Sequence, residues 1–158
     1  MNYGIVGCGN IGAAHANALL DDKRIETLYF HDNLTQRAEV FAKRYHGVAI
    51  AELDHFTENV NAVSITTPPE SHYELARHFL TRGVPVFCEK PLALFEDQAA
   101  ELVSLSQHQA IPLMVGFKMR YEPVFQRARQ ELAKIGSLLG ISTAKVQRAN
   151  LANKVNRW

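Results

Sequence analysis

The stretch Gly7-Cys8-Gly9-Asn10-Ile11-Gly12 follows a short apolar run and precedes a segment rich in helix-forming residues. Its glycines therefore fall on a turn from a strand to a helix, with the spacing G-x-G-x-x-G. Gly7 permits a tight turn, Gly9 lets a pyrophosphate approach the backbone, and Gly12 lets the helix pack closely on the strand. The N–H groups and dipole of the new helix favour phosphates. The pattern predicts a dinucleotide-binding turn, although a plain strand-to-helix turn is the simpler alternative.

A dinucleotide site also needs an acidic residue at the end of the second strand, about 20 residues after the glycines. Residues 25–31 resemble that strand, and Asp32 follows them. A carboxylate there accepts hydrogen bonds from both ribose hydroxyls and repels a 2′-phosphate, so Asp32 predicts NAD. The next two residues, Asn33 and Leu34, supply no cation, but Arg37 leaves NADP open as the less favoured cofactor.

Length and charge limit the other possibilities. The chain has 158 residues, of which 47% are hydrophobic and 21% charged, as expected of one globular domain or of one domain and part of another. Its 17 basic and 16 acidic residues give a net charge of +1, which does not favour binding to nucleic acid or to an anionic membrane.

The sequence also predicts a soluble, cytoplasmic protein. No signal peptide is visible, and no apolar stretch reaches the length of a membrane span. The two cysteines, Cys8 and Cys88, lack C-x-x-C partners, so we expect reduced, half-buried thiols. The seven histidines show no metal-ligand spacing, so we expect no metal.

Strand and helix patterns alternate along the first 117 residues. The predicted strands are residues 3–6, 27–31, 48–50, 61–65, 85–88 and 112–117. The predicted helices are residues 10–21, 35–45, 70–81 and 95–107. Thr35 is the expected N-cap of the second helix, and Gly83 ends the third. The apolar positions of the last helix, expected on one face, are Ala99, Leu102, Val103 and Leu105. The alternation predicts an α/β fold with a doubly wound parallel sheet.

The pattern changes after Phe117. Residues 123–134 resemble an amphipathic helix ended by Gly136, and residues 138–146 resemble one strand of a half-exposed sheet. A single strand cannot form a sheet. We therefore expect a dinucleotide-binding domain over residues 1–120 and the incomplete start of a second, α+β domain over residues 121–158.

In an open α/β sheet, ligands lie beyond the carboxyl ends of the strands. Residues 66–72, Thr-Thr-Pro-Pro-Glu-Ser-His, are either a capped helix start or a wall of the cofactor cleft. Lys90 in Glu89-Lys90-Pro91 is either a surface charge or a group that binds ribose and polarises or protonates a substrate oxygen. A cis bond before Pro91 is compatible with this turn. Arg120 either reaches the cofactor or forms an interdomain ion pair.

Together these motifs resemble the Gfo/Idh/MocA family, which comprises glucose-fructose oxidoreductase, inositol dehydrogenase and rhizopine catabolism proteins. The segments that carry the resemblance are residues 4–12, 67–72, 89–93, 116–123 and 136–140. The Glu-Lys-Pro motif is far more specific than the glycine pattern. Leu139 stands where the family pattern prefers Ile.

The resemblance implies an NAD(P)-dependent oxidoreductase that acts on a sugar, a cyclitol or a related polyol. It makes Lys90 the catalytic residue, in contact with cofactor and substrate oxygen. Thr67 and Pro68 would line the nicotinamide ribose, Glu89 would support the same site, and Arg120 would lie near the cofactor. The complete set of expected cofactor-binding residues is Gly7, Gly9, Asn10, Ile11, Gly12, Asp32, Thr67, Pro68, His72, Glu89, Lys90 and Arg120.

In this family a second domain supplies the substrate pocket and an acid/base Asp and His, which would lie beyond Trp158. We therefore expect a truncated dehydrogenase that binds NAD and is inactive as an isolated chain. The alternative is a non-catalytic NAD-binding or self-association module. An apolar helix and an unpaired strand favour a homo-oligomer, such as a strand-paired or swapped dimer.

Overall fold

The computed structural model describes residues 1–132, 134, 136–137 and 140 of the chain. The chain divides into two compact units, Met1–Phe117 and Lys118–Trp158, which are taken separately below. The domain boundary expected after residue 120 falls inside a short 3₁₀ helix, η2 (Lys118–Tyr121), at the start of the second unit.

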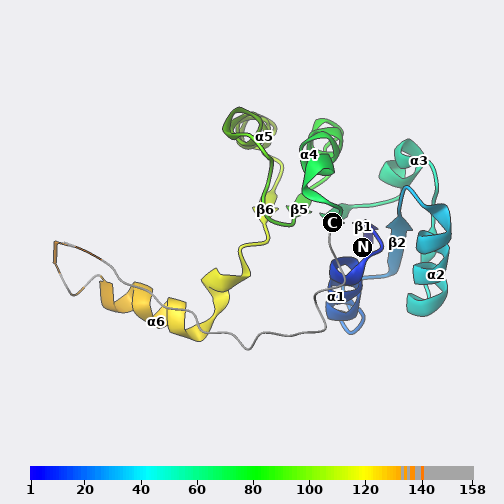
Figure 1. Cartoon of the computed structure of the whole chain (residues 1–158). Coiled ribbons are helices and arrows are strands. Elements are labelled where there is room, and N and C mark those ends of the chain that lie inside the picture. The colour runs from blue at the N-terminus through cyan, green and yellow to red at the C-terminus, as the bar shows by residue number, and fades with distance from the viewer. Residues whose placement is uncertain (133, 135, 138–139, 141–158) are drawn as a thin grey trace, which may run out of the picture. The chain divides into compact units, whose positions relative to one another are not determined.

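The first unit is built on a six-stranded parallel sheet with the strand order β3-β2-β1-β4-β5-β6 (Figure 1). The strands are β1 (Asn2–Val6), β2 (Thr27–His31), β3 (Val48–Ala49), β4 (Ala62–Ile65), β5 (Val86–Cys88) and β6 (Leu113–Val115). The order reverses between β1 and β4, so the topological switch point lies at the carboxyl end of β1, directly before the glycine turn. The expected doubly wound α/β fold is confirmed.

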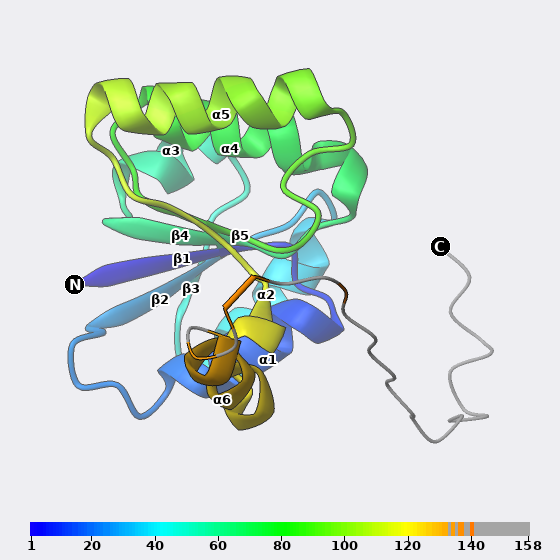
Figure 2. The ribbon, with the colours of Figure 1, turned by 90° about the vertical axis from the view of Figure 1, so that its left-hand side faces the viewer.

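Helices cover both faces of this sheet (Figure 2). On one face lie α1 (Asn10–Leu19) and α2 (Thr35–Tyr45). On the other lie α3 (Leu53–Glu58), α4 (His72–Thr81) and α5 (Glu96–Gln109). A 3₁₀ turn, η1 (Pro69–Ser71), leads directly into α4.

Two apolar layers hold the helices to the sheet. Ile5 packs in the layer beneath α1 and α2, while the next residue of β1, Val6, packs in the layer beneath α3, α4 and α5. Both are almost completely buried, as successive residues of a central strand covered on both faces must be. Aromatic side chains pack against one another in the layer beneath α1 and α2, where Phe30 lies edge to face on Phe41 with the ring centroids 5.7 Å apart.

Four local expectations were wrong or incomplete. The sequence pattern missed α3, because six residues are too few to display a helical period. Thr35 is the first residue of α2 and not its cap; Leu34 is the N-cap, and its N–H group donates to Asp32 Oδ1. The third helix begins at His72, after η1. Val103 is 44% exposed, because it follows the fully buried Leu102 by one residue, a rotation of about 100° around the helix.

The second unit is described as far as residue 140, with gaps. It contains η2 and α6 (Pro123–Leu132), which agrees with most of the helix expected over residues 123–134. Apolar side chains at Val124, Phe125 and Leu132 are exposed. The strand expected over residues 138–146 lies outside the described residues, apart from the single position 140.

Candidate cofactor site

The glycine turn leaves β1 in a conformation that requires glycine at its first position. Gly7 has a φ of +98°, in the left-handed region, and its N–H group donates to the carbonyl oxygen of His31 at 2.9 Å. A β-carbon on Gly7 would lie 2.8 Å from the backbone of Thr66 and Thr67. Any side chain at this position would therefore push the turn away from the end of β4.

The third glycine lets α1 approach β1. A β-carbon on Gly12 would overlap the carbonyl oxygen of Gly7, so only glycine fits. Thr66 strengthens the same contact, because its hydroxyl donates to the Gly7 carbonyl at 2.7 Å. Sequence reasoning did not single out Thr66. The signal in the sequence was a residue with a hydroxyl group directly after the apolar run that forms β4. At that position the hydroxyl can donate a hydrogen bond to the neighbouring turn.

The middle glycine faces open space. No atom lies within 4 Å of a β-carbon built on Gly9, so packing does not explain this glycine. Gly9 is the N-cap of α1, which has neither a side-chain cap nor an acidic residue in its first turn. The N–H groups of Asn10 and Ile11, both exposed, are therefore among those that a helix leaves without an internal partner. These features fit a bound pyrophosphate.

Asp32 lies next to this turn, at the end of β2. Its Oδ2 atom accepts the N–H group of Cys8 at 2.8 Å, and its Oδ1 atom accepts that of Leu34 at 2.9 Å. The carboxylate is thus held beside the turn, and its contact with ribose hydroxyls stays a prediction. The thiol of Cys8 is buried, and burial together with the Asp32 charge raises its pKa to about 12. That thiol is therefore neutral and unreactive near neutral pH.

The segment after β4 forms a wall next to the glycine turn. Ser71 Oγ donates to Thr67 Oγ1 at 2.7 Å, which fixes the first bend after Pro68. His72 is almost fully buried, and its ring faces two backbone oxygens: Nδ1 lies 2.6 Å from the Pro91 carbonyl and Nε2 lies 2.9 Å from the Thr67 carbonyl. The ring thus connects the Thr-Pro-Pro loop to the Glu-Lys-Pro loop. A direct contact between His72 and the cofactor stays a prediction.

The Glu-Lys-Pro loop follows β5. The Lys90–Pro91 peptide bond is cis, and the side chain of Lys90 is exposed. Glu89 is half-buried: its Oε1 atom lies 3.2 Å from Nε2 of His15, and its Oε2 atom accepts the Lys90 N–H at 3.3 Å. Gly116 lies against the same carboxylate, which a β-carbon there would approach to 2.9 Å. His15 was not among the expected site residues.

Arg120 lies in η2, in the second unit. The other expected residues belong to the first unit, where contacts join the glycine turn to Asp32 and to the Thr67 loop. His72 in turn connects the Thr67 loop to the Glu-Lys-Pro loop. The role of Arg120 near a cofactor stays a prediction. The described part of the chain contains no cluster of His, Cys, Asp or Glu suited to a metal ion, and none of its helices is long and apolar enough to cross a membrane.

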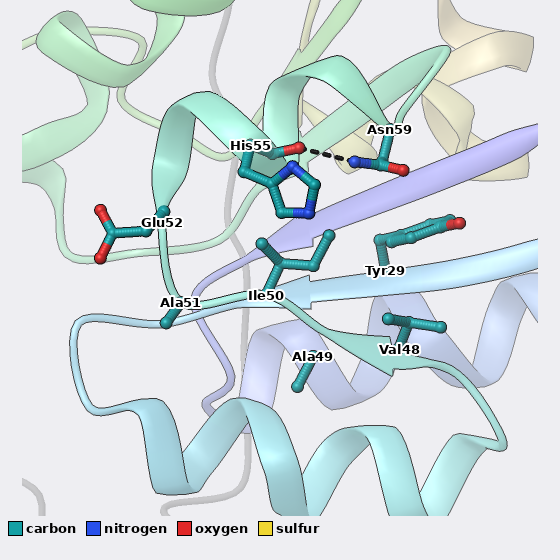
Figure 3. Close-up of a pocket in the computed structure, with 8 residues that line it drawn as sticks. All are labelled: Tyr29, Val48, Ala49, Ile50, Ala51, Glu52, His55 and Asn59. Atoms are coloured by element: carbon teal, nitrogen blue, oxygen red, sulfur yellow. Dashed lines mark hydrogen bonds between the residues drawn. The ribbon is translucent and has the colours of Figure 1, made fainter.

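A separate pocket of about 460 Å³ lies between β2, β3 and α3 (Figure 3). Its walls are mostly apolar, and the side-chain amide of Asn59 donates to the backbone oxygen of His55 across its upper end. The residues that line it are Tyr29, Val48, Ala49, Ile50, Ala51, Glu52, His55 and Asn59. None of them is an expected cofactor residue, and the helix that begins at this pocket, α3, has only six residues and an acidic residue, Asp54, in its first turn, which does not favour phosphates. The glycine turn therefore remains the candidate site.

A parallel sheet whose switch point carries this glycine turn, with an acidic residue at the end of the second strand, defines a nucleotide-binding Rossmann domain. Residues 1–117 match the GFO_IDH_MocA family model, described as an oxidoreductase family with an NAD-binding Rossmann fold, and the chain belongs to this family. The resemblance deduced from the sequence motifs is confirmed.

The chain is similar to inositol 2-dehydrogenase from Rhizobium meliloti (strain 1021), with 29% identity over 134 residues that cover 84% of this chain and 40% of the relative. Among solved structures, GenD2 from gentamicin A biosynthesis, in complex with NAD, has a TM-score of 0.78 and 27% identity, covering 84% of this chain and 39% of GenD2. KijD10, a 3-ketoreductase from Actinomadura kijaniata in complex with NADP, has a TM-score of 0.77 and 25% identity, covering 85% of this chain and 42% of KijD10. The chain spans about 40% of the length of its curated relatives.

Proposed function

We propose that this chain forms the NAD-binding part of a dehydrogenase that transfers hydride to or from a sugar, a cyclitol or a related polyol. The observation that carries the proposal is the open space at Gly9, in front of an uncapped helix N-terminus. At the N-cap of a helix without a side-chain cap, a glycine that packing does not require is explained by a ligand that comes close to the backbone. Inositol 2-dehydrogenase, a relative of this chain, supports the substrate class.

The cofactor contacts follow from the geometry of the first unit. The N–H groups of Asn10 and Ile11 would bind the pyrophosphate, helped by the positive end of the α1 dipole. Asp32 would accept the ribose hydroxyls of the adenosine half, which favours NAD because a 2′-phosphate would meet its negative charge. NADP remains the less favoured cofactor; the related KijD10 was solved with NADP.

The catalytic role falls to Lys90. When bound, NAD supplies the hydride acceptor. Lys90 follows the carboxyl end of β5 with its side chain exposed, and within the described part of the chain its ammonium group forms no hydrogen bond or ion pair. Its three donors are therefore available to a ribose hydroxyl and to the substrate oxygen, which Lys90 would polarise or protonate.

The remaining expected residues would frame the nicotinamide end. Thr67 and Pro68 would contact the ribose, and Glu89 would support Lys90 from the neighbouring position. His72 would contribute by holding the two loops together, in accordance with its contacts to the Thr67 and Pro91 carbonyls. Arg120 would also contact the cofactor, as the family resemblance implies.

Calorimetric titration of the 158-residue chain with NADH and NADPH tests the proposal. We expect NADH binding in the micromolar range or weaker, and weaker binding of NADPH. Gly9→Ala should fold like wild type, since a β-carbon meets nothing, but should lose NADH binding because the methyl group fills the space of the pyrophosphate. Gly140→Ala, which also faces open space, is the matched control. No heat with either cofactor would refute the proposal.

A second candidate function, self-association, is favoured by the exposed apolar residues of α6. Val124 is 67% exposed, and Phe125 and Leu132 are also exposed, so this helix carries an apolar surface that a homo-oligomer would bury. Light scattering tests this directly, and a monomer at every concentration would refute it.

We place the protein in the cytoplasm, where its two thiols, Cys8 and Cys88, would stay reduced.

A further inference from the structure

A chain of polar side chains runs from the sheet to the Glu-Lys-Pro loop. The hydroxyl of Tyr3 lies 3.0 Å from Ser64 Oγ, and Ser64 Oγ lies 3.0 Å from His15 Nδ1. The opposite ring nitrogen, His15 Nε2, lies 3.2 Å from Glu89 Oε1. Four residues from β1, β4, α1 and the end of β5 are thus connected, although nothing in the sequence places them together.

With one hydrogen on the His15 ring, only one arrangement of hydrogens satisfies all of these contacts. The ionised Glu89 carboxylate can only accept, so His15 Nε2 must carry the hydrogen. A neutral ring then has a lone pair on Nδ1, which accepts the Ser64 hydroxyl hydrogen. Ser64 in turn accepts the hydroxyl of Tyr3, whose pKa burial raises above its ordinary value, so this group keeps its proton. The chain of donors therefore points from Tyr3 to Glu89.

The ring and the carboxylate are also confined sterically. His15 packs edge to face on Phe87, with the ring centroids 5.2 Å apart. The side chain of His15 is 17% exposed and that of Glu89 is 22% exposed. On its other side the carboxylate lies against Gly116, where even a methyl group would come within 2.9 Å. His15, the N–H group of Lys90 and the backbone of Gly116 therefore surround the Glu89 carboxylate and limit the direction in which it points.

We propose that His15, in its Nε2–H form, is a positioning residue of the cofactor cleft: it holds the Glu89 carboxylate beside the backbone of Lys90 so that the nicotinamide end of NAD meets a fixed wall. The proposal rests on the proposed NAD binding, but its tautomer is a property of the free protein. A histidine that served only to fill space against Phe87 would need neither a preferred tautomer nor a carboxylate partner.

Nitrogen-15 NMR of the free chain at neutral pH tests the tautomer. We expect the His15 ring to carry its hydrogen on Nε2 alone, with a lone pair on Nδ1. In Glu89→Ala the acceptor is missing, and a mixture of both tautomers should appear. A wild-type ring protonated mainly on Nδ1, or an unchanged ring in Glu89→Ala, would overturn the inference.

NADH titration tests the positioning role. His15→Phe keeps a ring against Phe87 but cannot donate, and should weaken NADH binding about tenfold, as expected for one lost bond to a charged group. His15→Gln, which keeps a donor that can reach Glu89, should recover most of the affinity. The matched control is His78→Phe, because His78 also contacts a hydroxyl, Thr57 Oγ1 at 2.9 Å, and packs edge to face on Phe79.

The outcomes separate the two proposals. Equal NADH affinities for wild type and His15→Phe, with both folded by circular dichroism, would overturn the positioning role and leave NAD binding intact. Wild type that binds no NADH would refute the proposed function as well. If His15→Phe does not fold, the His15→Gln affinity and the wild-type tautomer decide: a tenfold loss in His15→Gln would contradict the role.

Discussion

The α-carbon of Gly12 lies so close to the carbonyl oxygen of Gly7 that a β-carbon on Gly12 would overlap that oxygen. The oxygen cannot move aside easily, because it also accepts the hydroxyl of Thr66 at 2.7 Å. The start of α1, the end of β1 and the end of β4 therefore meet at one backbone atom. This close approach keeps the helix N-terminus over the switch point of the sheet.

Gly12→Ala should therefore destabilise the protein as well as impair cofactor binding. We expect a loss of about 1–3 kcal/mol in the free energy of unfolding, the usual cost of overpacking. Urea denaturation followed by circular dichroism measures it. Gly9 lies three positions before Gly12 and has open space around a β-carbon, so Gly9→Ala should unfold like wild type. Equal stability of Gly12→Ala and wild type would contradict the geometry.

Asp32→Asn should change the choice of cofactor. The amide keeps an oxygen to accept the Cys8 N–H group but loses the charge that repels a 2′-phosphate. We expect NADH affinity to fall about tenfold and the preference for NADH over NADPH to shrink. Titration with both cofactors measures this, with Asp97→Asn, on the surface of α5, as the control. An unchanged ratio of the two affinities would show that Asp32 does not select the cofactor.

His72→Ala should loosen two loops at once. The variant removes a buried ring and its hydrogen bond to a loop carbonyl, which costs about 0.5–1.5 kcal/mol, and it leaves a cavity between the two loops. Urea denaturation should show a large drop in stability, and hydrogen exchange should rise at Thr67 and around the Glu-Lys-Pro loop. His108→Ala, an exposed histidine on α5, should leave both measurements unchanged. If hydrogen exchange rose equally in His72→Ala and His108→Ala, the proposal that His72 connects the two loops would be refuted.

The two thiols should make the protein sensitive to alkali. Burial raises the pKa of both Cys8 and Cys88 from 9.0 to about 12, with further contributions from the nearby Asp32 and Glu89 charges. The unfolded chain therefore releases these protons at lower pH than the folded chain, so stability is full below about pH 9 and falls as pH rises towards 12.

Thiol reactivity provides a direct measurement. At pH 8 an alkylating reagent should leave both cysteines unmodified in the folded chain and label both in denaturant. Cys8→Ala should weaken the loss of stability between pH 9 and 12, because one of the two titrating groups is gone. Rapid labelling of Cys88 in the folded protein would contradict its complete burial.

Much of the fold was predictable because its signals are local. The glycine spacing, the apolar runs of β1 and β4, and the acid at Asp32 each lie within one short segment, and the alternation of strands and helices limited the topology to a doubly wound sheet. The failures were also local: α3 is too short for a period, and Val103 belongs to a helix whose buried face is narrower than its apolar pattern.

The candidate site was less predictable, because several of its contacts join residues far apart in the chain. The contact of His15 with Glu89 spans 74 positions, and the bond from Thr66 to Gly7 spans 59. A histidine in a helix and a threonine after a strand have no distinctive pattern. Their importance arises from the parallel register, which aligns Val6 with Ile65 and Ile65 with Cys88, and so brings the ends of three strands together.

The sequence by itself determined the class of fold, the family and the position of the glycine turn, since these depend on spacing along the chain. Only the tertiary structure decided why each glycine is there: Gly7 for its φ, Gly12 for the carbonyl beside it, and Gly9 for neither reason. It also decided that His15 faces Glu89. Such facts depend on which atoms the packing brings within a few ångströms, and spacing along the chain does not fix that.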